Sequence, residues 1–423
     1  MLKENFLLDD FQEAGTSIEA FAERIKEIAS KTTFYKCNSR ELSVLSYVDM
    51  IDTDKGERMQ FYEFNPMRVP SEGGSLKLSA SKLTINPVNI LSKGNFEPLL
   101  KEVKDNTGVL FYNGTKALFV SKKVLTQRLQ PFGLGGDFLA DKSMERDLLI
   151  AKRFAKGLNR TLVVREINGL KKVFSVLGEK YRHMPQDILI DIYNELPKDE
   201  LGDPDCRYWE ISHFHSGIRV EFPKKAKELQ ALYGLPDDFV PGVFLSTSDT
   251  GDSSIRVRSV WRTKNSYSLH GEVARRHSGN IDIKDLFEDI EEKIFAEYAK
   301  LPEALCDLMS QDITDPSWDL TNTKDRAKNK AKLENVLKTA FKQLKITSAI
   351  GKKAEMALFE QVLDEFDDSM AYTAYDIAVS IMSTPERVSG LHSLLQEKLG
   401  EAVGRAPYIK YESTKTEPII LTA

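Results

Sequence analysis

Cysteine is scarce in this sequence, and the three that occur stand far apart. Cys37, Cys206 and Cys306 are separated by about a hundred residues or more, and no histidine accompanies them at zinc-finger spacing. The pattern argues against a disulfide framework and predicts three reduced thiols in a cytoplasm. No local nucleophile signature indicates a catalytic cysteine.

Long apolar runs are also missing. No stretch reaches the roughly eighteen consecutive apolar residues of a membrane-spanning helix, and the first ten residues lack the uninterrupted apolar core of an export signal. We therefore expect a cytoplasmic protein with no membrane partner.

A large excess of either charge is absent as well. The net charge is −5 and the pI about 5.9, so no global field draws the chain to nucleic acid or to an anionic membrane. Hydrophobic residues make up 41% and charged residues 29%, which is the balance of a folded globular protein. Any nucleic-acid contact must come from a local patch.

The chain has 423 residues and no internal repeat, which favours several distinct units over a solenoid. We predict an α+β fold, with antiparallel sheet regions packed with helices and a mainly helical C-terminal region. The predicted units are a mixed α/β region (1–104), a helix-plus-hairpin region (105–200), an antiparallel strand-rich core ending in a long helix (201–315) and a helical region (316–423).

Local patterns place several elements. Amphipathic spacing predicts helices over 17–30 and 143–158, and Asn-Gly pairs predict hairpin turns at Asn113-Gly114 and Asn168-Gly169.

Three further elements follow. A hairpin over 208–222 is expected to turn at Ser216-Gly217. A long helix is expected over 283–309, and the Pro-Ser-Glu-Gly-Gly stretch at 70–74 reads as a loop.

The segment 254–262 alternates like a strand that follows a turn at 249–252. One face would carry Ile255, Val257 and Trp261, and the other Arg256, Arg258 and Arg262. The guanidiniums would lie roughly 6 to 7 Å apart, close to the phosphate repeat of an extended single strand. Arginines paired with acids on a neighbouring strand are the alternative interpretation.

The run 246–254, Ser-Thr-Ser-Asp-Thr-Gly-Asp-Ser-Ser, resembles the "NSHDGS" stretch of a family of phage and plasmid proteins defined by a domain of unknown function. As in that family, a strand, Asn265 and an Arg-His-x-Gly element at 276–279 follow. Two more segments share the resemblance: 146–193, with a "LS-x-RY"-like turn at 177–182, and 371–376. Together they cover roughly residues 105–400.

Three departures from the family pattern bear on chemistry. Ser248 stands where the family has a histidine, Thr250 is inserted into the Asp-Gly pair, and no cysteine precedes Asn265. If that histidine or cysteine were catalytic in relatives, this chain would be inactive. The resemblance therefore implies no catalytic residue and no cofactor here.

Other cations complete the predicted nucleic-acid site. Arg275, Arg276 and His277 precede the helix expected at 283 and suit a phosphate, although His277 could equally be a buried structural histidine. The most basic helix, 324–345, adds Lys328, Lys332, Lys338 and Lys342. A solvated helix face is its alternative.

Aromatic residues could supply stacking platforms for bases. The candidates are Tyr208, Trp209, Phe214, Trp261 and Tyr267, although strand aromatics are commonly core residues. His213 and His215 would share a strand face, but without a third ligand they are a poor metal signal, and we expect no metal. Gly133 to Asp137 reads as a connection between helices, because the Gly-Lys-Ser/Thr ending of a phosphate loop is missing.

These observations predict a phage- or plasmid-type accessory protein that binds nucleic acid, with single-stranded DNA as the expected partner, in replication or recombination. The order of strands and helix from 243 to 309 is similar to the core of phage strand-annealing proteins. One alternative is a non-enzymatic interaction or assembly module, oligomeric with itself. A second is a metal-dependent nuclease built on Asp249, Asp252, Glu210 and Glu221.

Overall fold

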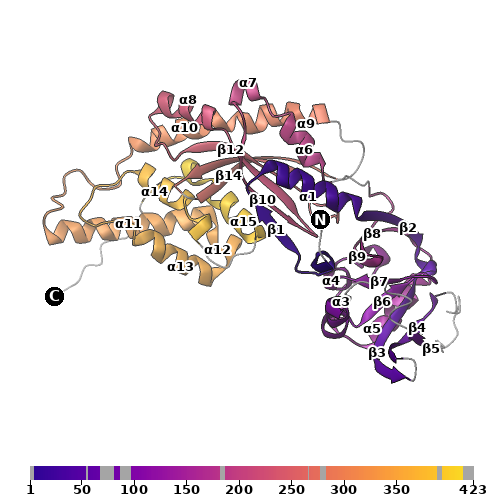
Figure 1. The fold of residues 1–423 in the computed structure, drawn as a ribbon. Coiled ribbons are helices and arrows are strands. Elements are labelled where there is room, and N and C mark those ends of the chain that lie inside the picture. Colours follow the sequence, from indigo (N-terminus) through magenta and orange to yellow (C-terminus); the bar gives the residue numbers. More distant parts are fainter. Residues whose placement is uncertain are drawn as a thin grey trace, which may run out of the picture.

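The structure, a computed structural model, describes residues 4–53, 56–66, 81–85, 97–181, 186–264, 266–276, 283–387 and 393–412. It is a mixed α+β fold with two largely antiparallel sheets and a mainly helical C-terminal region, which confirms the predicted class. Figure 1 shows the two sheets side by side, with the C-terminal helices at the far end of the larger unit. The predicted loop at 70–74 lies outside the described residues.

The six-stranded sheet, here called sheet A, is antiparallel throughout. Its order is β1-β10-β11-β12-β13-β14. Its strands are β1 (Gln12–Gly15), β10 (Asp205–Ser212), β11 (Ser216–Glu221), β12 (Val240–Thr247), β13 (Ile255–Thr263) and β14 (Ser266–Arg275). Five of the six follow one another in the chain, so nearly every connection is a hairpin or a short helix-bearing loop.

The eight-stranded sheet, here called sheet B, has the order β2-β8-β9-β7-β6-β3-β4-β5. Only β7 and β9 run parallel. Its strands are β2 (Thr32–Asn38), β3 (Ser43–Thr53), β4 (Gly56–Phe64), β5 (Ser81–Ile85), β6 (Val109–Tyr112), β7 (Ala117–Val120), β8 (Asn159–Ile167) and β9 (Leu170–Leu177). Sheet B therefore takes strands from both sides of residue 104, while β1 of the N-terminal region joins sheet A.

Helices cover both sides of sheet A, as Figure 1 shows. On one side lie α8 (Pro223–Tyr233), α9 (Ile283–Ile290) and α10 (Glu297–Met309). On the other side lie α11 (Thr323–Leu344), α12 (Ile346–Ile350), α13 (Lys352–Leu363), α14 (Ala374–Met382) and α15 (Ser393–Val403). The remaining helices are α1 (Ile18–Ser30), α3 (Glu97–Glu102), α4 (Lys122–Gln127), α5 (Met144–Phe154), α6 (Ile188–Asn194) and α7 (Lys198–Leu201).

Capping and turn residues fix several elements, among them the predicted helices that begin after Ser17 and Ser143. Ser17, Ser121 and Ser143 each cap a helix, accepting a bond from a backbone N–H of the first turn. The hairpin β8–β9 turns at Asn168 and Gly169, whose φ angles of 51° and 80° are those of a tight hairpin turn.

The hairpin over 208–222 forms, but its turn was misplaced. Ser216 and Gly217 lie inside β11, and the connection between β10 and β11 runs through His213 and His215 instead. Gly217 is needed for packing, because a Cβ there would meet the Phe244 ring at 2.8 Å. The sequence suggested a turn because glycine is common in turns, whereas Gly217 is there to let the Phe244 ring pack closely.

The helix expected over 283–309 spans those residues with a change of winding. Between α9 and α10 lies η7 (Glu291–Phe295), a π-helical turn, and Pro302 sits within α10. No helix in the described ranges is both long and apolar enough to cross a membrane.

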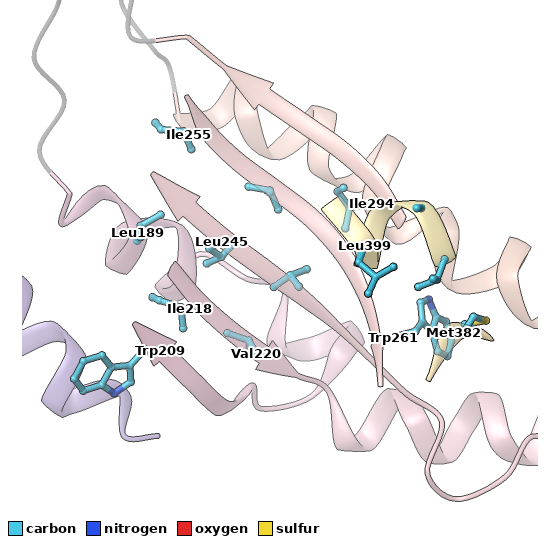
Figure 2. Packing of buried hydrophobic residues seen from close by; sticks show 14 of the residues in the cluster. Leu189, Trp209, Ile218, Val220, Leu245, Ile255, Trp261, Ile294, Met382 and Leu399 are labelled. Atoms are coloured by element: carbon cyan, nitrogen blue, oxygen red, sulfur yellow. The ribbon is translucent and has the colours of Figure 1, made fainter. Parts of the chain in front are cut away.

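The main core lies between sheet A and its helices. Ile255, Val257 and Trp261 are fully buried in it, so the predicted apolar face of β13 is confirmed. Figure 2 shows the cluster extending from Trp209 across the sheet to Trp261, where Met382 of α14 joins it. A second core lies between sheet B and helices α4 and α5.

Helix α15 packs on the edge strand β14 through glycine. A Cβ at Gly400 would lie 3.2 Å from the Leu269 side chain, closer than ordinary contact, and a Cβ at Gly404 would overlap the Leu269 carbonyl oxygen. The backbone of this helix end therefore packs directly on the backbone of β14. This close approach brings Glu397 and Glu401 within reach of Arg258 on β13.

Gly404→Ala should destabilise the fold by about 1–3 kcal/mol, because the added methyl forces helix and strand apart. Urea unfolding followed by circular dichroism measures this change. Gly178→Ala is the matched control, since its Cβ would meet nothing within 4 Å, and its free energy of unfolding should stay within about 0.5 kcal/mol of the parent. Equal stability of both variants would contradict the close packing of α15 on β14.

Candidate functional site

The three arginines of β13 share one face of sheet A, as predicted. Arg258 stands opposite Phe244 of β12 and Glu272 of β14, on the face that holds the small apolar cluster of Phe244, Val260 and Leu269. Helix α15 covers this face, so the arginines point toward a layer of protein.

Arg258 is neutralised where it lies. Its side chain is only 6% exposed, and its guanidinium lies 2.6 Å from Glu272, 3.3 Å from Glu397 and 3.8 Å from Glu401. A buried guanidinium requires such partners, because an isolated buried charge is very costly. The pairing with an acid on the neighbouring strand is the alternative that the sequence left open.

Arg262 is paired in the same way at the other end of β13. Its Nε donates to Glu221 of β11 at 2.7 Å, and Glu221 also accepts from Arg207 at 3.1 Å and from the Tyr267 hydroxyl at 2.9 Å. Glu221 is almost fully buried. One carboxylate thus holds two guanidiniums and a phenol.

The remaining predicted cations are divided. Arg275 pairs with Asp289 of α9, and Arg276 is exposed. His277 lies outside the described residues. Arg256 differs from its two neighbours on β13: among the described residues no carboxylate pairs with it, and its Nε is buried without a hydrogen-bond partner.

A cavity of about 450 Å³, here the sheet-face cavity, opens between this face and α15. Arg219 of β11 lines it, 3.8 Å from the ring centroid of Tyr267 and 5.4 Å from that of Tyr208. Neither Arg219 nor its contacts with two tyrosines were expected from the sequence, because the three side chains come from β10, β11 and β14, which only the folded sheet brings together. The planar rings and guanidinium form a stacked polar wall.

Two carboxylates that line this cavity, Glu210 and Glu397, lie close to an imidazole. His215 Nε2 lies 3.4 Å from Glu210 and 3.6 Å from Glu397. Burial by itself would raise the pKa of Glu210, but His215, the Tyr208 hydroxyl and Arg219 outweigh it and hold that pKa below its ordinary value. Burial, followed by the charge of Glu210, raises the pKa of Tyr208 to about 12.

The four carboxylates of the nuclease alternative do not converge. Glu210 faces the sheet-face cavity and Glu221 binds Arg262, whereas Asp249 and Asp252 lie against sheet B. Within the described ranges no three or more His, Cys, Asp or Glu side chains gather as a metal site would require. His213 and His215 do not share a site either, because His213 is buried between the sheets.

The turn at 249–252 is a buried junction between sheets A and B. Asp249 receives Arg165 Nη2 of β8 on both carboxylate oxygens, at 2.9 and 3.0 Å, and both side chains are almost wholly buried. Arg165 also contacts His213 Nδ1, and His213 stacks on Phe174 at 3.7 Å. Burial, followed by the charge of Arg165, holds the pKa of His213 well below its ordinary value.

The rest of the turn is bonded just as fully. Asp252 pairs with Arg128 and with Lys123, the latter at 2.6 Å. The Thr250 carbonyl accepts from Ser175 of β9 at 2.6 Å. Gly251 has φ +79°, which favours glycine. The residues that carry the family resemblance therefore hold the two sheets together.

Helix α11 carries the other predicted cations on its exposed side. At 100° per residue, five lysines fall on one face opposite the buried stripe of Leu333, Leu337 and Leu344. This lysine face consists of Lys324, Lys328, Lys332, Lys338 and Lys342, of which all but the half-buried Lys332 are exposed. Lys328 bonds Asp325 at 2.7 Å, and Lys338 bonds Glu334.

Aromatic side chains are distributed differently from the expectation. Trp209 and Trp261 are core residues, with 6% and 0% exposure, so they cannot stack bases. Trp318, in the connection before α11, is half-buried beside the lysine face, with Lys332 Nζ 5.5 Å from its ring centroid. Only tertiary packing reveals it, since it belongs to no periodic segment.

Arg165→Met should lower the free energy of unfolding by about 3–5 kcal/mol, because Asp249 would stay buried without its cation. Lys171→Met on the same hairpin is the control, since its bridge to Glu166 is solvent-accessible and should contribute less than about 1 kcal/mol. Chemical denaturation compares the two. A loss no larger than that of the control would show that the junction does not depend on this pair.

Stability should also fall on acidification through His270. Burial lowers its folded pKa to about 3, so below about pH 6.5 the unfolded chain takes up a proton that the folded chain does not. This single residue then removes up to about 1.4 kcal/mol per pH unit. The pH dependence of unfolding should be flatter by that amount in His270→Gln, and superimposable slopes would refute the assignment.

Comparison with known proteins returns no family model, no curated protein and no solved structure that matches this chain. The resemblance to the phage and plasmid family stays a prediction. The function must be argued from the chemistry of the surfaces described above.

Proposed function

We propose that this chain binds single-stranded nucleic acid, with single-stranded DNA as the expected ligand, through the lysine face of α11. The resemblance to phage and plasmid proteins suggests replication or recombination of the annealing type as its setting. The observation that carries the proposal is the alignment of five lysines along one helix face beside a half-buried tryptophan.

The lysine face has the dimensions of a strand-binding surface. Lys324 and Lys342 are 18 positions apart in one continuous helix, so the face is about 27 Å long at 1.5 Å per residue. Within the described part of the chain, no carboxylate lies within ion-pair distance of Lys332 or Lys342. These ammonium groups are available to phosphates.

The paired lysines remain available too. Lys328 and Lys338 bond acids three or four residues away on the same helix, and such exposed pairs contribute only about 0.3–0.5 kcal/mol. A phosphate can replace the carboxylate at little cost. By contrast, Arg258 is itself buried among three carboxylates, and Arg262 is bound to the buried Glu221, so neither is open to a phosphate.

Trp318 supplies the second requirement of a single-strand site. Base stacking on an aromatic side chain contributes about 1–3 kcal/mol per base and tolerates every sequence. Lys328 and Lys332 lie 6.0 and 5.5 Å from its ring centroid. A base on the indole would therefore place its phosphate near both ammonium groups.

Replacing Lys328, Lys332, Lys338 and Lys342 together by alanine should weaken binding and flatten its salt dependence. For single strands the slope of log K against log salt changes by about 0.7 per phosphate contact, so loss of four contacts reduces it by about 3. Fluorescence anisotropy with a labelled oligonucleotide, titrated from low to moderate salt, measures both quantities. Alanine keeps the helix, because it has the highest helix propensity.

The control variant removes the same charge elsewhere. Lys198, Lys224, Lys225 and Lys227 lie on α7 and α8, and their replacement by alanine should leave the salt slope unchanged. Trp318→Ala should lower affinity with little change in slope. Absence of binding at low salt, or equal slopes for both four-lysine variants, would overturn the proposal, and a large oligomer free of nucleic acid would favour an assembly module.

A further inference from the structure

A second cavity, here the edge cavity, lies where β14 closes sheet A. It has a volume of about 460 Å³, within the range of small-molecule sites. The register of β13 and β14 skips Gly271, whose φ is +30°, so the strand bulges at the cavity. Glu297 of α10 lies against the bulge, and Gly404 and Tyr408 also line the cavity.

Ion pairs account for the acids of this cavity but not for all its arginines. The charged lining residues are Arg256, Arg258, Arg405, Glu272, Glu297 and Glu401. Glu272 and Glu401 both engage Arg258, and Glu297 engages Lys300 and the Tyr408 hydroxyl, each at 3.4 Å. Over the described ranges, Arg256 and Arg405 are left without a carboxylate partner.

Polar atoms around the cavity are left without hydrogen bonds. The Nε of Arg256 is buried and has no hydrogen-bond partner, and the Nδ1 of His270 is also buried without one. Arg405 makes one bond, from Nη2 to the Leu344 carbonyl at 2.9 Å, although a guanidinium carries five N–H donors. Buried polar groups in folded proteins nearly always have a hydrogen-bond partner, so the unsatisfied guanidinium donors are open to one.

We propose that the edge cavity binds a phosphate monoester through Arg256 and Arg405. Two guanidiniums without carboxylate partners match the charge of a phosphate dianion, and the guanidinium fork fits its oxygens. Tyr408, 49% exposed at the cavity wall, offers a ring on which a nucleobase stacks. The ligand is therefore a mononucleotide unit, either free or as the 5′-phosphate end of a strand.

Calorimetric titration of the full chain with deoxyadenosine 5′-monophosphate at low ionic strength tests the site. Binding is expected, while deoxyadenosine, which lacks the phosphate, should not bind. Arg256→Gln should weaken the nucleotide by about tenfold or more, the effect of losing a charge-assisted hydrogen bond. Arg256→Lys keeps the positive charge but loses the forked donors of the guanidinium, so its affinity for the nucleotide should lie between those of the parent and Arg256→Gln.

A second titration separates the two sources of the phosphate. Oligonucleotides with a 5′-phosphate and with a 5′-hydroxyl are compared by anisotropy on the parent chain and on Arg256→Gln. A preference for the phosphorylated end that vanishes in Arg256→Gln assigns the site to strand ends, and mononucleotide binding alone assigns it to free nucleotides. Both outcomes support the site.

Two controls keep the result interpretable. Arg153→Gln on α5 removes a guanidinium beside sheet B and should change neither titration, and thermal melts confirm that each variant folds. Binding of neither probe, or equal binding by the parent and Arg256→Gln, would overturn the proposal.

The site does not depend on the lysine face of α11. The four-lysine variant should still bind the mononucleotide, and Arg256→Gln should keep the salt slope for an oligonucleotide with a 5′-hydroxyl. If one of the two proposed sites does not bind, the measurement for the other site can still succeed, so the two proposals are tested separately.

Discussion

The buried ion pair between Arg165 and Asp249 is the contact on which the arrangement of the two sheets depends. Arg165 lies opposite Lys172 on the neighbouring strand of sheet B, and both cations are buried. Each needs a carboxylate from elsewhere: Asp249 from the turn of sheet A, and Asp9 and Glu102 for Lys172. Because an unpaired buried charge is so costly, these pairs fix the junction more specifically than apolar contact, which has no direction.

The same requirement shapes the opposite face of sheet A. Arg258 and Arg262 are held by glutamates from α15, β14 and β11, so most positive charge on β13 is consumed by the fold. The ligand sites proposed above are the lysine face of α11 and the two arginines of the edge cavity. With a net charge of −5, any anion binding must rest on local groups of cations and not on a global field.

Much of the local structure could be predicted because it depends on near neighbours. Serine caps, Asn-Gly turns and the alternation of β13 specify backbone geometry within a few residues. The turn after β10 was misplaced because Gly217 serves close packing against Phe244, a contact between strands that sequence spacing does not show. The π-helical turn η7 was missed for a similar reason, since Gly271 of β14 packs against the Lys293 carbonyl.

The candidate site also has a part that the sequence predicted and a part that only the fold decided. By itself the sequence determined the α+β class, the buried face of β13 and the lysine-rich helix, because hydrophobic period and charge pattern are local properties. Only the tertiary structure decided which cations pair with glutamates and which have no carboxylate partner among the described residues, and that the turn at 249–252 is a junction between the sheets. Ion pairing joins residues such as Arg165 and Asp249, 84 positions apart, and its energy depends on burial, which the fold alone sets.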